Sequence, residues 1–337
     1  MDWFERLTGF IEVGYDDTRS RLEVVGRQLR SRTNGACYGI GELELVSLRR
    51  LRQNASSGAG VTGRLTVRNV SGDVRRMHES SAYADALFQV ASQFNLLEMV
   101  SPDVSPEQGV TRYQYDKTQG PACAIAAGAG TIYRNYFAPI GDEHGQTGER
   151  QLDGLADVGA ALRHALNRPV SALWTMRNGY AMCNREGLAA IGALMRAMST
   201  ADLDALRDLL RIGVHRDVEV TDGDAPQRQF VSQAFCSALP VAYTSIAAIH
   251  WQPFAQLVLE AAYEATLWVA VLNAQRGVSN IVLLTRLGGG AFGNTDIWID
   301  AAMRRALMKF KDFRLDVRLV SFGATPTSML ALEHDFE

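Results

Sequence analysis

The pattern of hydrophobic and polar positions is clearest in the last hundred residues. Hydrophobic side chains recur at three- and four-residue steps over 251–272, which predicts a long helix with one broad apolar face. The continuous apolar run 281–284 predicts a strand that is buried on both faces. A glycine loop over 288–294 follows it, then a second helical pattern over 299–310 and a strand over 315–322. This order of elements is typical of a three-layer α/β sheet.

The rest of the chain is predicted to complete this domain and to add to it. Strands are expected over 65–70 and 86–92, whereas 102–130, rich in Pro, Gly, Thr and Gln, is expected to be mainly an ordered loop. The low-complexity run 55–60 is typical of a flexible linker, so we expect an N-terminal extension over 1–60 and a domain over 61–337. The segment 138–228 is predicted to be a helical insertion, with helices over 153–166, 184–198 and 201–211 and strands over 172–176 and 212–220.

Composition and charge narrow the class of protein. The 337 residues are 47% hydrophobic and 21% charged, with a formal net charge of −3, as in a soluble globular chain. Basic residues form no run against a neutral background, so we expect no nucleic-acid partner. The most apolar long stretch, 254–272, contains Gln256, Glu260 and Glu264, so we expect no membrane span. The sequence does not indicate the oligomeric state.

Cysteine usage and the first residues indicate the compartment. The four cysteines lie far apart and form no CxxC pair, which argues against a zinc ribbon or a disulfide scaffold and favours a reducing environment. The first ten residues contain two acidic side chains and no apolar core, so no secretory signal is recognised. We therefore expect a cytoplasmic protein. The acidic loop over 142–144 is interpreted as a solvated surface, and no metal site is predicted.

The glycine loop is the strongest chemical feature of the sequence. It follows a buried strand and opens a helix, so its backbone can approach a ligand closely and its free amides favour an anion. It has neither the Lys-Ser/Thr of a P-loop nor the spacing of a Rossmann turn. We predict a phosphate site, with a tight structural turn as the alternative. A second small-residue segment, 118–130, is expected to face it, which suggests a ligand with two phosphates.

These motifs together resemble the macrodomain family. Gly72-Asp73-Val74 resembles its G-D-[IV] turn, and the strand that ends in Ser92-Gln93-Phe94-Asn95 resembles the strand before its first loop. Gly288–Gly293 is similar to its second loop, G-x-G-x-[FY]-G. The resemblance covers two blocks, 61–137 and 229–323. It implies a three-layer α/β/α macrodomain-like mixed sheet, here with an N-terminal extension and a helical insertion.

The resemblance implies a site for ADP-ribose, without a cofactor or a metal. Asp73 would accept from the adenine amino group, Asn95 would hold the distal ribose, Phe292 would lie against that ribose and Phe322 would stack on adenine. Taken singly, these residues also fit a turn aspartate, a strand-end cap and core aromatics. The two loops would bracket the diphosphate through Gln119, Gly120, Gly288, Gly289, Gly290, Ala291, Gly293 and Asn294.

The chain departs from the family where catalysis is concerned. Its first loop has no triple glycine, and it lacks the paired glutamates that poly(ADP-ribose) glycohydrolases place after theirs. Cleavage at the distal ribose needs a carboxylate, and Asp116, beside the first loop, is the leading candidate. Its alternative is a solvated loop residue paired with Lys117. Glu98 and Glu107 are weaker candidates. Bacterial effector enzymes that release ADP-ribose from arginine, with acidic residues outside the usual motif, offer a further comparison.

We therefore predict a hydrolase that removes ADP-ribose from modified protein side chains. Its partner would be ADP-ribose or an ADP-ribosylated protein. Three alternatives stay open: a non-catalytic reader of ADP-ribose, a hydrolase of a small ADP-ribose derivative, and an interaction domain whose glycine loop is only structural. The extension and the insertion are expected to be surplus to ligand binding and to determine the choice of substrate.

Overall fold

A seven-stranded mixed sheet forms the centre of the protein. The computed structural model describes residues 1–56, 60–223 and 228–336. The strand order is β4-β11-β12-β6-β13-β14-β5; β12, β6, β13, β14 and β5 run parallel, whereas β11 is antiparallel to both of its neighbours. Their bounds are β4 Glu42–Ser47, β5 Thr66–Ser71, β6 Leu87–Ala91, β11 Arg211–Glu219, β12 Phe230–Cys236, β13 Ile281–Leu284 and β14 Asp316–Ser321.

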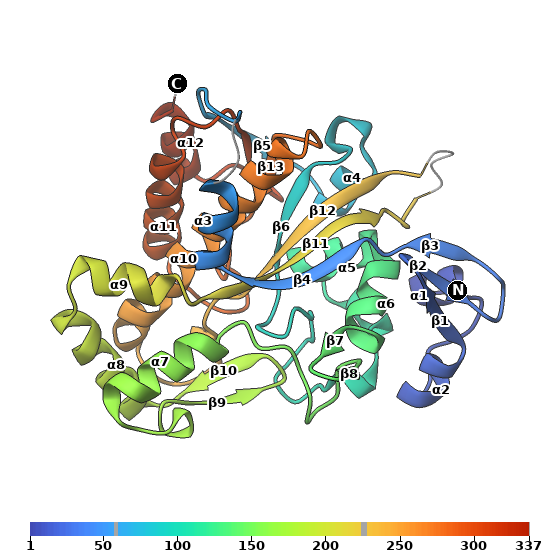
Figure 1. Cartoon of the computed structure of the whole chain (residues 1–337), viewed down its shortest axis with the longest axis horizontal. Coiled ribbons are helices and arrows are strands. Elements are labelled where there is room, and N and C mark those ends of the chain that lie inside the picture. Colours follow the sequence, from blue (N-terminus) through green and yellow to red (C-terminus); the bar gives the residue numbers. More distant parts are fainter. Residues whose placement is uncertain (57–59, 224–227, 337) are drawn as a thin grey trace.

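Helices cover both faces of this sheet, because its central strands are apolar on both sides. In β6, Leu87 belongs to the core on one face, and Phe88 and Val90 belong to the core on the other. The first face carries α3 (Leu48–Ser56), α10 (Ala248–Gln275) and α11 (Asp296–Lys309), and the second carries α4 (Val74–Glu79), α5 (Gln119–Ala126) and α6 (Gly128–Tyr136) (Figure 1). The predicted three-layer α/β/α arrangement is confirmed.

Helix α10 is the main core helix and contains the predicted range 251–272, but it is buried on almost every side and not along one face alone. By length and composition alone it could cross a membrane, yet 78% of its most apolar 18-residue window is buried inside the protein. Its carboxylate Glu264 is 1% exposed and is paired with Arg52 of α3 and with Arg305 and Lys309 of α11. These ion pairs fasten three helices of one layer together, because a buried carboxylate needs compensating charge.

The central sheet includes strands from the predicted extension, 1–60, and from the predicted insertion, 138–228. Strand β4 comes from the N-terminal 60 residues and forms one edge, and β11 comes from the segment 138–228 and lies between β4 and β12. Both segments are therefore part of the central sheet. Residues 57–59 of the predicted linker lie outside the described residues.

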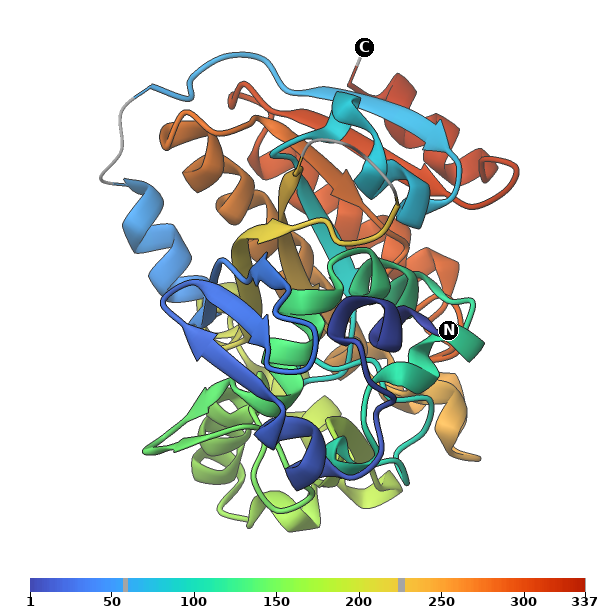
Figure 2. The ribbon, with the colours of Figure 1, turned by 90° about the vertical axis from the view of Figure 1, so that its right-hand side faces the viewer.

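Residues 3–39 form a small unit at the side of the molecule. It contains α1 (Trp3–Thr8), α2 (Tyr15–Ser20) and a three-stranded sheet of β1 (Leu22–Val25), β2 (Gln28–Ser31) and β3 (Cys37–Gly39). Figure 2 shows this unit in front, lying against the segment that contains α6, with which it shares a hydrophobic core.

One predicted loop is largely helical. The stretch 119–136 forms α5 and α6, although 102–130 reads as loop in the sequence. Helix α5 consists mostly of small residues that are buried on almost every side, so it shows no amphipathic period. Helix α6 begins with three more small residues, Gly128, Ala129 and Gly130. The remaining elements are β7 Pro139–Ile140, β8 Glu143–His144, α7 Ala156–Leu166, β9 Trp174–Arg177, β10 Tyr180–Cys183, α8 Arg185–Ala197, α9 Thr200–Arg207 and α12 Thr327–His334, with 3-10 turns η1 Ser81–Tyr83, η2 Pro106–Gln108, η3 Thr111–Tyr115, η4 Val170–Ala172 and η5 Val241–Tyr243.

Candidate active site

A groove runs along the carboxyl ends of the parallel strands. It consists of two cavities of about 180 and 600 Å³ that share part of their walls. The first lies beyond β6 and β13, and the second beyond β5 and β14. Ligands of open α/β sheets bind at this edge. The residues that line both cavities are Asp116, Thr118, Gln119, Thr285 and Arg286.

The glycine loop forms one wall of the first cavity. Gly288 has a φ of +73°, and a Cβ there would lie 2.4 Å from the Cβ of Ala238, so the turn requires glycine. Buried Asn294 closes the loop by donating to the carbonyls of Leu239 and Gly288. Gly288, Gly290, Ala291 and Phe292 line the cavity, whereas Gly289, Gly293 and Asn294 shape the loop behind it.

The loop gives a matched pair of glycine substitutions. Gly288→Ala is expected to lower the free energy of unfolding by about 2 kcal/mol or more, because it combines a left-handed φ with a clash. Gly290 has open space where its Cβ would be, so Gly290→Ala is expected to change stability by less than about 0.5 kcal/mol. Urea denaturation of both variants measures the difference. Equal losses would show that the loop does not adopt this conformation.

The first turn of α5 forms the opposite wall and is fastened to β6. The Gln119 amide accepts from the Ala91 N–H and donates to the Gln89 carbonyl, both at 2.8 Å. Gly120 packs so closely that a Cβ there would lie 1.9 Å from the Ala91 carbonyl oxygen. Both predicted ligand residues line the first cavity, but the polar atoms of the Gln119 side chain are already bonded to the strand.

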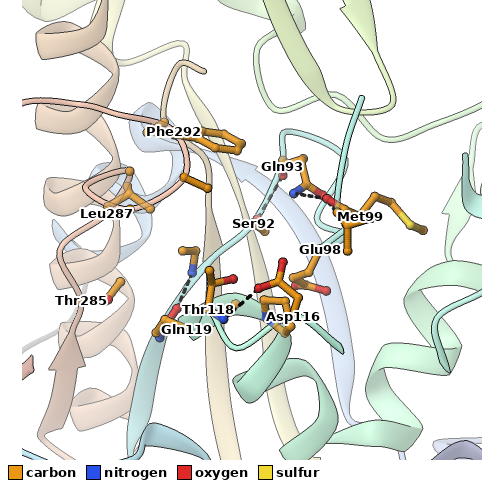
Figure 3. A pocket seen from close by; sticks show the side chains of 18 of the residues that line it. Ser92, Gln93, Glu98, Met99, Asp116, Thr118, Gln119, Thr285, Leu287 and Phe292 are labelled. Carbon is orange, nitrogen blue, oxygen red and sulfur yellow. Dashed lines mark hydrogen bonds between the residues drawn. The ribbon is translucent and has the colours of Figure 1, made fainter. Parts of the chain in front are cut away.

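Two carboxyl groups face the first cavity, and their surroundings differ. Glu98 is 1% exposed, with one oxygen 3.5 Å from Arg134 Nη2 and the other, Oε1, buried without a hydrogen-bond partner among the described residues. Burial raises the pKa of Glu98 to about 7, against the opposing effect of the Arg134 guanidinium. Asp116 is half-buried where the two cavities meet and accepts from the Thr118 N–H at 2.8 Å. Figure 3 shows both on the side opposite Leu287 and Phe292.

The backbone around Glu98 is held firmly. Its N–H donates to the Tyr113 hydroxyl at 3.0 Å. The next residue, Met99, donates to the Gln93 side chain at 2.8 Å, and its carbonyl accepts from the Tyr180 hydroxyl at 2.6 Å. These bonds fix the backbone from which the Glu98 side chain extends toward the cavity.

Two predicted site residues lie away from the groove. Asn95 is fully buried, bonds to Gln151 and to the Leu97 N–H, and lines neither cavity, because the chain turns back at Leu96 with a φ of +65°. Glu107 lies in η2 and accepts from the Gly148 N–H, also outside both cavities. The structure therefore gives no support to Asn95 as a ribose ligand or to Glu107 as a catalytic carboxylate.

The two residues predicted to hold adenine do lie at the second cavity. Asp73 lines it and caps α4 by accepting from the Arg75 N–H at 2.9 Å. Phe322 also lines it and is 83% exposed, which leaves its ring free to stack on a base. Both positions agree with the predicted roles, which no ligand in the structure tests.

Sequence reasoning missed several residues of the groove. Tyr180 and Tyr243 complete the first cavity with Phe292, at ring-centroid distances of 5.2 and 5.6 Å from it. Arg286 lines both cavities and is paired with Asp296 and Asp300. These residues come from separate parts of the chain and carry no motif. Across 1–56, 60–223 and 228–336, no group of three or more metal-ligating side chains occurs.

Comparisons with known proteins give a distant likeness. No family model matches the sequence, and no curated protein matches it. Solved structures similar to this fold include poly(ADP-ribose) glycohydrolases. The Deinococcus radiodurans enzyme in complex with ADP-ribose is 13% identical, with a TM-score of 0.45 over 88% of this chain and 94% of that chain. The Thermomonospora curvata enzyme bound to the inhibitor ADP-HPD is 13% identical, with a TM-score of 0.36 over 95% and 96%. At these scores no residue role is transferred from those proteins.

Proposed function

We propose that this protein is a hydrolase that releases ADP-ribose from modified protein side chains. The observation that carries the proposal is one groove in which a glycine loop suited to an anion faces two carboxyl groups, Glu98 and Asp116. In this proposal adenine lies at Asp73 and Phe322. The diphosphate lies between the start of α5 and the loop 288–293, and the distal ribose occupies the first cavity.

The two carboxyl groups would act as general base and general acid. Asp116, half-buried and bonded to an N–H, would take a proton from the attacking water, whose oxygen forms a bond to the anomeric carbon. Glu98, whose pKa burial raises to about 7, would in its neutral form give its proton to the departing nitrogen or oxygen as the glycosidic bond breaks. Both carboxyls then exchange protons with solvent. Two phosphates nearby would favour the neutral form of Glu98 further, because negative charge raises a carboxyl pKa.

Replacement of Asp116 tests the proposal directly. Asp116→Asn is expected to lower kcat for ADP-ribose release by about 100-fold or more, because an amide cannot accept the proton from water. The dissociation constant for ADP-ribose is expected to change by less than about threefold, since the phosphate contacts remain. A release assay on ADP-ribosylated protein and calorimetric titration with ADP-ribose measure the two quantities. Asp142→Asn, in an exposed loop outside both cavities, is the matched control.

The same measurements separate the alternatives. Binding of ADP-ribose without any release by the unaltered protein would identify a reader. Faster turnover of a phosphorylated or acetylated ADP-ribose than of modified protein would identify a hydrolase of small derivatives. The absence of a thermal shift with millimolar ADP-ribose would leave the glycine loop as a structural turn.

A further inference from the structure

We infer that Glu12 is a positioning residue of this site. Through it, the N-terminal unit holds the segments that carry Glu98 and Asp116 in place. The inference rests on the proposed function for its catalytic meaning. Glu12 lies between α1 and α2, in the part of the chain that sequence analysis treated as surplus to ligand binding.

The Glu12 carboxylate is an acceptor for three donors from outside its own segment. The N–H groups of Val110 and Thr111 donate to it at 2.9 and 2.7 Å, and the Tyr136 hydroxyl donates to it at 2.7 Å. Gly109 makes room for it, with a φ of +80° and a hypothetical Cβ only 2.4 Å from the carboxylate carbon. Trp3 adds a bond to the same turn, from its indole N–H to the Thr111 carbonyl at 3.1 Å.

The first two donors begin the turn η3, which touches both carboxyl-bearing residues. Tyr113, 1% exposed, accepts the Glu98 N–H on its hydroxyl at 3.0 Å. Its carbonyl accepts the Asp116 N–H at 3.1 Å. A shift of η3 would therefore move the backbone of Glu98 and of Asp116 together.

The third donor belongs to α6, which holds the Glu98 side chain. Arg134, two residues before Tyr136, reaches Glu98 Oε2 from Nη2 at 3.5 Å and donates from Nε to the Leu96 carbonyl at 3.0 Å. The Arg134 guanidinium carbon also lies 3.8 Å from the centre of the Phe235 ring, which fixes its plane. Glu12 thus joins the turn that holds the Glu98 backbone to the helix that holds its carboxyl group.

This arrangement connects a residue outside the groove with its chemistry. Glu12 lines neither cavity, so it has no contact with a ligand placed there. Catalytic groups must stay close to their productive geometry, and a displacement of about 1 Å can lower a rate by about 100-fold. Loss of Glu12 is therefore expected to act on turnover more than on binding.

Glu12→Gln tests the inference, because the amide keeps the shape of the side chain but loses the charge. We expect kcat to fall about 10-fold or more, with the dissociation constant for ADP-ribose within about threefold of the unaltered protein. Hydrogen exchange resolved by residue is the second measurement. The amides of Val110, Thr111 and Glu98 are expected to exchange about 10-fold faster or more, with those of β6 and β13 unchanged. Tyr136→Phe, which removes one of the three donors, is expected to give a smaller change of the same kind.

Glu42→Gln is the control. Glu42 lies in the same N-terminal 60 residues, is exposed, and pairs with Arg27, and neither residue lines the groove. It is expected to leave kcat and the Glu98 exchange rate unaltered. Faster exchange at Val110 and Thr111 with an unchanged Glu98 amide would overturn the inference and leave Glu12 as a local support. If the unaltered protein releases no ADP-ribose, the proposed function fails, yet the exchange at Glu98 still decides whether Glu12 positions it.

Discussion

Glu98→Gln is expected to lower kcat for ADP-ribose release by about 100-fold or more, because glutamine has the shape of a neutral glutamate but no proton to give. The pH dependence of kcat/KM is a more specific test of the acid role of Glu98. The Glu98 pKa is raised to about 7 by burial, and its protonated form is the active one, so kcat/KM of the unaltered protein should fall as pH rises through about 7. In Glu98→Gln this fall should be missing from the remaining activity.

A purely structural role for Glu98 predicts something else. As a counter-ion for buried Arg134 it would be ionised at neutral pH, and its loss would destabilise the protein without altering the pH profile of the folded fraction. Arg134 has further partners in the Leu96 carbonyl and the Phe235 ring, so we expect the variant to fold and to bind ADP-ribose. Glu107→Gln is the control and should leave both kcat and the profile as they are. An unchanged profile in Glu98→Gln would refute the acid role.

Gly120→Ala is expected to lower the free energy of unfolding by about 3 kcal/mol or more and to abolish binding of ADP-ribose. A methyl group there would lie 1.9 Å from the Ala91 carbonyl oxygen and 3.1 Å from Glu98 Cγ. Neither the end of β6 nor the start of α5 can give way alone, because Gln119 bonds one to the other. Urea denaturation and calorimetric titration measure the two losses.

A second glycine supplies a control, because its replacement is expected to raise the free energy of unfolding. Gly192 lies inside α8, and its nearest neighbours would be the flexible end of Arg196 at 3.3 Å and Pro253 at 3.6 Å. Gly192→Ala is expected to raise stability by about 0.5–1 kcal/mol, because alanine favours a helix interior. A loss of less than about 1 kcal/mol in Gly120→Ala would mean that α5 does not pack on β6 as closely as described.

The local pattern of hydrophobic residues and glycines predicted three elements of the last hundred residues correctly. The helix over 251–272, the strand over 281–284 and the glycine loop are all found where the sequence places them. Their signal is strong because large apolar side chains recur along the helix and fill the strand, and both lie in the core around the sheet.

Long-range contacts account for what the sequence could not predict. Glu98 and Arg134 are separated by 36 positions, and no motif indicates that one faces the other. Asn95 follows a strand as a ligand residue should, but the left-handed turn at Leu96 sends its side chain inward. Helix α5 is hidden in a run of small residues, whose helical period disappears when every side is buried, and α6 begins in the same run.

The sheet topology has a consequence for the synthesis of this chain on the ribosome. The first three strands of the sheet, β4, β5 and β6, pair only with strands that begin at Arg211 or later: β4 with β11, β5 with β14, and β6 with β12 and β13. The first 210 residues therefore emerge without a partner for any of these strands. Chains with such distant pairings fold slowly and expose strand edges in the meantime. We expect the nascent protein to depend on chaperones until β14, the partner of β5, has left the ribosome.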